Sequence, residues 1–138
     1  MARNRNLDRE EVRLWLADSE DCLKVAEQNF ELGNYHVAAF FVHSALERAL
    51  KAAIAAFRQK APPKTHNLKR LYSEVADQVR LGREQVDFLG EVTPASQTAR
   101  YVDVAMALPR EIYSKTLVER YLSSAKPVLG VIRRRLRA

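Results

Sequence analysis

Apolar side chains recur at intervals of three and four residues along most of this chain, which is the spacing of an amphipathic α-helix. The longest such run lies between Gly33 and Ala61 and contains no proline and no further glycine. It is rich in alanine and leucine, which have high helix propensity. Its apolar positions form two adjacent stripes, a face too wide for one neighbouring helix to cover. The pattern predicts a long central helix within a bundle.

A second periodic run comes before the central helix and predicts a helix over residues 8–32. Asp8 and Glu11 have the spacing of a capping box at its start. Gly33 suits the left-handed conformation that ends a helix, and Asn34 suits the N-cap of the next one. Because this link is so short, the two helices are expected to run antiparallel, side by side.

Prolines divide the rest of the chain into shorter segments. Pro62 and Pro63 end the central helix, because neither can donate the hydrogen bond that another turn requires. Further helices are expected over residues 67–79, from Gly82 to the Thr93–Pro94 pair, and from near Ser114 to the C-terminus. Residues 93–103, rich in hydroxyl and amide groups, give no clear helical pattern. The expected fold is a single all-α domain over residues 1–138, an up-and-down bundle of four to five helices.

Composition narrows the class of protein further. Cys22 is the single cysteine, so neither a disulfide framework nor a paired-cysteine zinc site is expected. No signal peptide or membrane-spanning run is visible, and we expect a cytoplasmic protein with no membrane partner. The 23 Lys and Arg exceed the 17 Asp and Glu by six. This surplus suits a phosphate-bearing partner, or it serves only solubility.

Three sequence segments, taken in order, carry a resemblance to a known domain family. The first is AEQNFELGNYHVAAFFVHSALERALKAAI, which ends in a Glu-x-x-Leu-Lys-Ala run formed by Glu47, Leu50, Lys51 and Ala52. The second is a Pro-x-Thr-His-x-Leu segment formed by Pro63, Thr65, His66 and Leu68. The third is Ala99-Arg100-Tyr101-Val102-Asp103, with Val102 where a proline is usual. Together, over about residues 10–135, they resemble the HEPN domain family (higher-eukaryote and prokaryote nucleotide-binding domain).

The resemblance implies a helical bundle that usually forms a homodimer, a role with nucleotides or RNA, and a minimal nucleotidyltransferase as partner. Many members of the family are metal-independent ribonucleases with an Arg-x4-6-His motif. Here no arginine has that spacing before His36, His43 or His66, and no histidine follows Arg100. We therefore expect a binding module without catalytic residues or cofactor. The alternative is a ribonuclease or toxin with an altered site built from His66 and Arg100.

Arg100, Tyr101 and Asp103 are the best candidates for ligand binding. The arginine fork matches a phosphate, and the tyrosine ring offers a face on which a base can stack. Alternatively, an Arg100–Asp103 ion pair pins the loop to the bundle. Lys51 and Lys64 are weaker members of the same possible anion site.

The histidines have both functional and structural interpretations. In the functional interpretation, His66 faces a phosphate or acts as an acid–base group. In the structural interpretation, it forms a hydrogen bond that holds its loop closed. His36, His43 and Glu47 share a helical stripe, but about 10 Å of helix rise separates the two histidines. One metal ion cannot easily bridge that distance, so structural hydrogen bonds are expected there and no metal site.

The C-terminal run consists of Arg133, Arg134, Arg135 and Arg137. Such a cluster either contacts a nucleic-acid backbone, where each phosphate contact adds salt dependence, or forms a solvated tail.

Overall fold

The structure is a computed structural model that describes the backbone of residues 5–137 and the side chains of residues 9–137. This part of the chain is helical and contains no strand. The helices are α1 (Arg5–Glu31), α2 (Tyr35–Arg58), α3 (Leu68–Ser73), α4 (Arg83–Val92), α5 (Ala95–Thr98), α6 (Val102–Ala105), α7 (Pro109–Ile112) and α8 (Lys115–Arg137).

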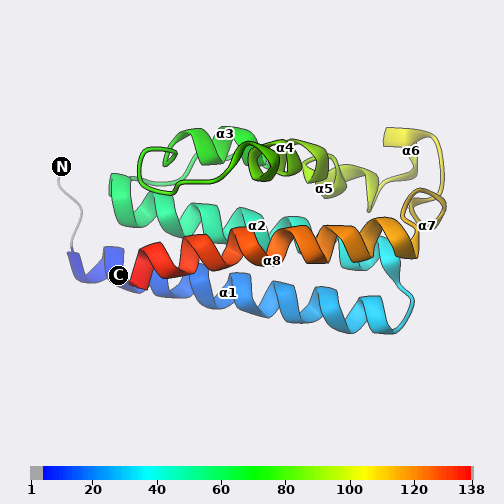
Figure 1. The fold of residues 1–138 in the computed structure, drawn as a ribbon, viewed down its shortest axis with the longest axis horizontal. Coiled ribbons are helices and arrows are strands. Elements are labelled where there is room, and N and C mark those ends of the chain that lie inside the picture. Colours follow the sequence, from blue (N-terminus) through cyan, green and yellow to red (C-terminus); the bar gives the residue numbers. More distant parts are fainter. Residues whose placement is uncertain (1–4, 138) are drawn as a thin grey trace.

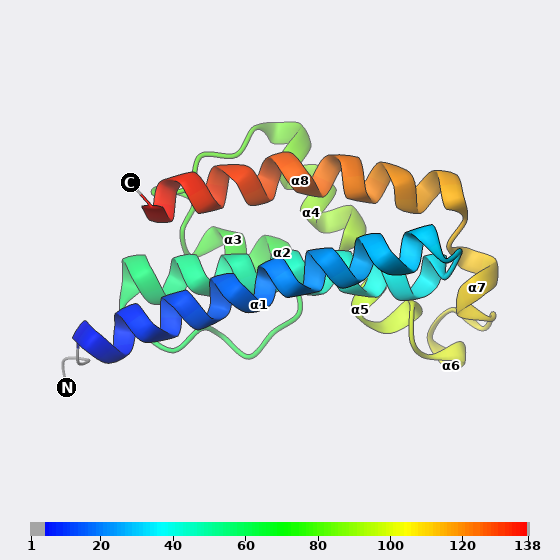
Figure 2. The same ribbon diagram turned by 90° about the horizontal axis from the view of Figure 1, so that it is seen from below.

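Three long helices, α1, α2 and α8, lie along the long axis of the molecule (Figure 1). Helix α2 is central, because α1 and α8 both pack along it while α3 and α5 contact another of its sides. Helices α6 and α7 lie at the end of the bundle where α1 turns into α2 (Figure 2). The predicted all-α bundle with a long central helix is confirmed, with short helices in place of a fourth long one.

The apolar face of α2 explains its central position. Leu46, Leu50 and Ile54 are completely buried, and each stabilises the fold by about 2 kcal/mol through burial alone. The alanines between them are also buried and leave little side chain between adjacent backbones. Because α2 buries most of its surface, its wide apolar face is covered by other helices of the bundle, and little apolar surface remains for contact with a partner.

The turn between α1 and α2 confirms part of the prediction. Gly33 has a positive φ of 82°, a conformation that suits glycine. Asn34 occupies the N-cap position, but its side chain donates to Asn29 Oδ1 at 3.3 Å and makes no capping hydrogen bond. The capping box at Asp8 is wrong, because the helix has already begun at Arg5.

The predicted helix over residues 67–79 is correct only in its first half, because α3 ends at Ser73. The chain continues in tight turns that the Tyr72 hydroxyl stabilises. This hydroxyl donates to the Val79 carbonyl at 2.7 Å and accepts from the Leu81 N–H at 3.1 Å. Val79 is therefore buried without being helical. The central helix also stops early, at Arg58, with Gln59 in the left-handed region at φ 51°.

The irregular stretch over residues 93–103 contains the one-turn helix α5 and the start of α6. The last helix begins as expected, since Ser114 Oγ accepts a hydrogen bond from the Leu117 N–H at 3.1 Å. Among the described residues, no helix combines the length and apolar character needed to cross a membrane.

Candidate functional site

A buried carboxylate lies halfway along α2. Glu47 is only 4% exposed, and His66 Nδ1–H donates to its Oε1 at 2.6 Å. On its other oxygen, Oε2, Lys51 Nζ donates at 3.3 Å and Arg48 Nη1 at 3.4 Å. Burial alone would raise the pKa of Glu47, but the His66 hydrogen bond and the Lys51 charge outweigh burial and lower it. The carboxylate therefore stays ionised within a cluster of donors.

His43 supports this arrangement from the preceding turn of α2. Its ring is 1% exposed, and Nε2–H donates to the His66 carbonyl at 2.8 Å. Burial lowers the pKa of His43, so the ring is neutral and its Nδ1, 4.0 Å from Glu47, carries no proton. His43 thus has the structural role expected of it: it fastens the loop that carries His66 to α2.

His66 has the structural role considered for it, and part of its ring stays exposed. Its Nδ1–H is held by Glu47, which closes the loop, while 58% of the side chain remains exposed. In the neutral ring this bond leaves the lone pair on Nε2, where no other group among residues 9–137 forms a hydrogen bond with it. An exposed imidazole oriented by a buried carboxylate can take up a proton from a ligand.

The two lysines predicted as weaker candidates differ. Lys51 belongs to the cluster, and its Nζ also lies 5.5 Å from the centre of the Trp15 ring. Lys64 is exposed in the loop before His66 and forms no ion pair within the described part of the chain. It is free to contact a ligand but is not held in place.

Arg100 lies between two aromatic rings. Its guanidinium carbon is 4.7 Å from the centre of Phe40 on α2 and 4.9 Å from that of Tyr101. Its Nε–H donates to the Ser96 carbonyl at 2.8 Å, which leaves both terminal nitrogens available. Two rings and one carbonyl thus fix an exposed cation in one position.

The ion pair considered as an alternative role for Arg100 and Asp103 is absent from the side chains described, and Arg100 pairs with no other carboxylate among them. Asp103 is instead exposed on the one-turn helix α6. Tyr101 is 45% exposed. The 93–103 loop is therefore held by backbone and aromatic contacts rather than by an Arg–Asp pair.

The Arg100 and His66 positions share one side of α2. Their partners, Phe40 and Glu47, are seven residues apart on α2, or about 10 Å along the helix axis. Thr93 links the two segments, because its hydroxyl accepts from the Leu68 N–H at 3.1 Å. The structure thus brings together two candidates that lie far apart in the sequence.

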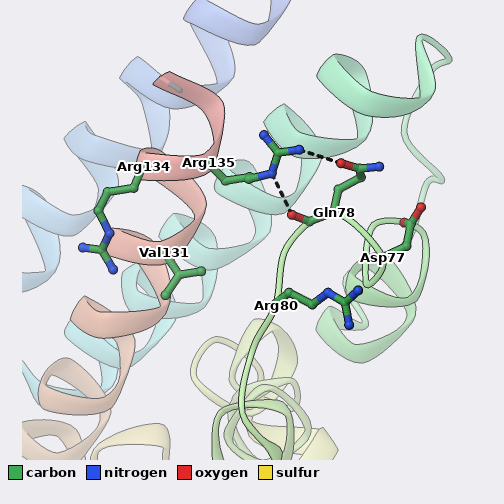
Figure 3. A pocket seen from close by; sticks show the side chains of 6 residues that line it. All are labelled: Asp77, Gln78, Arg80, Val131, Arg134 and Arg135. Carbon is green, nitrogen blue, oxygen red and sulfur yellow. Dashed lines mark hydrogen bonds between the residues drawn. The ribbon is translucent and has the colours of Figure 1, made fainter.

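The C-terminal arginines separate into two pairs. Arg133 Nε and Arg137 Nη2 approach the Glu20 carboxylate of α1, at 3.6 and 3.0 Å. Arg134 and Arg135 instead line an open groove beside the end of α8 (Figure 3). The run therefore makes structural contacts along part of its length, and it is not a free tail.

Over residues 9–137, no three His, Cys, Asp or Glu side chains are arranged to hold a metal ion. Cys22 is buried, and burial raises the pKa of its thiol. His36 is partly buried near the start of α2.

Comparison with known protein families shows to which family this chain belongs. A sequence model described as the HEPN domain matches residues 12–135, which is most of the chain. The chain belongs to the HEPN domain family. A comparison with curated proteins gave no match.

Two solved structures share the HEPN fold of this chain. TT1696 from Thermus thermophilus superposes with a TM-score of 0.81 at 24% identity, over 90% of this chain and 97% of that one. ST0689, an archaeal HEPN homologue, gives a TM-score of 0.73 at 18% identity, over 91% of this chain and 97% of that one. At such identities the likeness establishes the bundle and says nothing about ligands.

Sequence reasoning missed Phe40 as the ring that holds Arg100, and it grouped Glu47 with His36 and His43 rather than with His66. Phe40, Glu47 and Lys51 lie at helical spacing on one face of α2, and this spacing was the available signal. Nothing in the sequence indicated that Phe40 would face Arg100 or that Glu47 would bind His66, because both contacts join distant segments.

Proposed function

We propose that this HEPN protein is a nucleotide- or RNA-associated binding module, without catalytic activity of its own, that holds a phosphate group on Arg100. The observation that carries the proposal is the state of this guanidinium: it is fixed, exposed and without an acidic partner among the described side chains. Arg120, in contrast, pairs with Glu91 through two hydrogen bonds. An arginine with a purely structural role is stabilised by such a carboxylate partner, which Arg100 lacks.

The free atoms of Arg100 suit this ligand. Its Nε donates to Ser96, so the two terminal nitrogens remain for two parallel hydrogen bonds to phosphate oxygens. The adjacent Tyr101 ring is 45% exposed and provides surface for a base. Because Phe40 and Ser96 already restrict the guanidinium, little side-chain entropy is lost on binding.

Calorimetric titration with ATP at low and moderate salt tests this proposal. We expect saturable binding to the wild-type protein that persists at moderate salt, and no binding to Arg100→Ala. Arg100→Lys keeps the charge but loses the fork, so it should bind about tenfold more weakly. Arg110→Ala removes an exposed arginine of α7 and serves as the control, with unchanged affinity. Equal affinity of wild type and Arg100→Ala would contradict the proposal.

The module is further proposed to act as a homodimer through residues 102–108. Val102, Val104 and Met106 are 54, 50 and 85% exposed, a concentration of apolar surface that is costly to leave in water. Val102 and Met106 also line a surface cavity of about 370 Å³ together with Leu108. A second copy of the chain would cover these side chains next to Arg100.

A minimal nucleotidyltransferase is the proposed partner protein, on the strength of the family resemblance. Expressing the two chains together and purifying one through an affinity tag tests this. Recovery of both in a fixed ratio supports the partnership, and elution of the tagged chain alone contradicts it.

A ribonuclease with a non-standard site is the second candidate, and one observation favours it. Glu47 fixes His66 so that the exposed Nε2 of the neutral ring can accept the proton of a ribose 2′-hydroxyl. Incubating an oligoribonucleotide with excess protein tests this. Cleavage by wild type but not by His66→Ala would support the enzyme, and intact RNA in both samples would exclude it.

A further inference from the structure

The groove beside the C-terminal end of α8 is separate from the Arg100 position. It has a volume of about 490 Å³, and its lining residues are Asp77, Gln78, Arg80, Val131, Arg134 and Arg135 (Figure 3). Arg135 stacks on Phe57 of α2, whereas Arg100 stacks on Phe40. Seventeen residues separate these two rings on α2, which corresponds to about 25 Å along the helix axis. One mononucleotide therefore cannot occupy both places.

Arg135 forms a fixed wall of the groove. Its Nε donates to the Gln78 carbonyl at 3.0 Å, and its Nη2 donates to Gln78 Oε1 at 2.7 Å (Figure 3). The guanidinium carbon lies 4.8 Å from the centre of the Phe57 ring. These contacts join α8 to the turns that follow α3, so the groove is built by the fold.

Arg80 and Arg134 supply free positive charge. Both are exposed, and neither forms a hydrogen bond or an ion pair with any described residue. Gly130 leaves room for Arg134 to fold back along α8, because a Cβ there would lie 3.2 Å from Arg134 Nη1. The acidic residue of the groove, Asp77, is already paired with Arg58. The groove therefore carries three guanidinium groups and no uncompensated carboxylate.

We propose that this groove binds the phosphodiester backbone of a single nucleic-acid strand. Three guanidinium groups along an open groove match successive phosphates rather than one terminal phosphate. Val131 alone among the lining residues is apolar, so a peptide would find no pocket for an anchoring side chain. The Phe57 ring is covered by Arg135, so the groove contacts the backbone and reads no base.

Fluorescence anisotropy with a labelled oligouridylate of about twelve nucleotides, within the site sizes of known single-strand binders, tests the proposal. The dissociation constant is measured over a series of salt concentrations for wild type and for Arg80→Gln/Arg134→Gln. Removing two phosphate contacts should reduce the slope of log affinity against log salt by about 1.4. Affinity at moderate salt should fall about tenfold.

A charge-matched variant provides the control. Lys24→Gln/Lys115→Gln removes the same charge from exposed positions outside the groove and should keep the wild-type slope. Equal losses in both double variants would overturn the proposal, because net charge alone would then explain binding. Polyglutamate that competes as well as unlabelled oligouridylate would also overturn it. Melting curves confirm that each variant is folded.

Arg100→Ala separates this groove from the proposed nucleotide site. The groove proposal predicts that Arg80→Gln/Arg134→Gln still binds ATP, and that Arg100→Ala keeps the salt dependence due to Arg80 and Arg134. If Arg100→Ala abolishes oligouridylate binding while Arg80→Gln/Arg134→Gln changes nothing, the groove proposal fails and the Arg100 proposal stands. If Arg100→Ala still binds ATP while the groove variant no longer binds the oligonucleotide, the Arg100 proposal fails and the groove proposal stands.

Discussion

Glu47 and Phe40, the ring on which Arg100 packs, lie on the same side of α2, about 10 Å apart along its axis, yet the surroundings of Glu47 and Arg100 differ. Glu47 is buried and surrounded by a histidine, a lysine and an arginine. Arg100 is exposed, and aromatic rings rather than a carboxylate hold it. A buried charge must be partnered to be tolerated, whereas an exposed cation fixed without a partner remains available to a ligand. The charge of Glu47 therefore stabilises the fold, whereas the charge of Arg100 is available to bind a ligand.

Glu47→Ala should have the largest effect on stability. It leaves Lys51, whose side chain is 13% exposed, without its carboxylate and releases the His66 loop. We expect a loss of about 3 kcal/mol in the free energy of unfolding, measured by urea denaturation. Glu10→Ala, which breaks an exposed pair with Arg13, is the control and should leave the midpoint unchanged. An unaltered midpoint for Glu47→Ala would show that the cluster contributes nothing.

His43→Gln should alter the pH dependence of stability. The pKa of His43 is lowered by burial, so below about pH 6.5 the unfolded chain binds more protons and the wild type loses stability as pH falls. Glutamine keeps a donor for the His66 carbonyl but does not titrate. The free energy of unfolding, measured by urea denaturation, should therefore change less between pH 6.5 and 5 in the variant, by up to about 1.4 kcal/mol per pH unit.

Other titrating groups near His43 set the lower part of the profile. Glu47, His66 and Arg48 act on His43 electrostatically and remain in the variant. The pKa of Glu47 is lowered from 4.5, so its contribution is present above that value and is lost as pH falls through its folded pKa. Both proteins should therefore weaken in stronger acid. Identical profiles above pH 5 would contradict a neutral, buried His43.

Val104→Asp should have the smallest effect on folding stability and a large one on association. Val104 is 50% exposed, so the folded monomer loses little when it becomes polar. A charge in the proposed apolar interface should shift the protein from dimer to monomer in light scattering at micromolar concentration. Leu14→Asp, which changes a 53% exposed residue of α1, is the matched control and should stay dimeric. A monomeric wild type would refute the interface.

The sequence predicted elements that depend on local signals. The Gly33 turn, the start of α8 near Ser114 and the presence of a long central helix follow from residues close in sequence. The family resemblance was also recognisable, because its three segments occur in order. Local signals failed at residues 74–79, where the Tyr72 hydroxyl replaces helical hydrogen bonds with contacts of its own.

The candidate site was only partly predictable for the same reason. Arg100, His66 and Lys51 were identified by residue type and resemblance, but their partners depend on how distant segments pack. The sequence offered an Arg100–Asp103 pair as one alternative, whereas the fold places Phe40 and the Ser96 carbonyl against the guanidinium. The division of the C-terminal arginines likewise depends on Glu20, more than one hundred residues away in the sequence, as the Arg137 contact shows.

The central claim is that Arg100 is held for a ligand and not for the fold. Thermal melting of wild type and Arg100→Ala, each with and without ATP, tests it most directly. We predict similar melting temperatures without ATP and a rise with ATP in the wild type alone, because a ligand stabilises only the state that binds it. A lower melting temperature of Arg100→Ala without ATP, with the same rise on adding ATP, would contradict the claim.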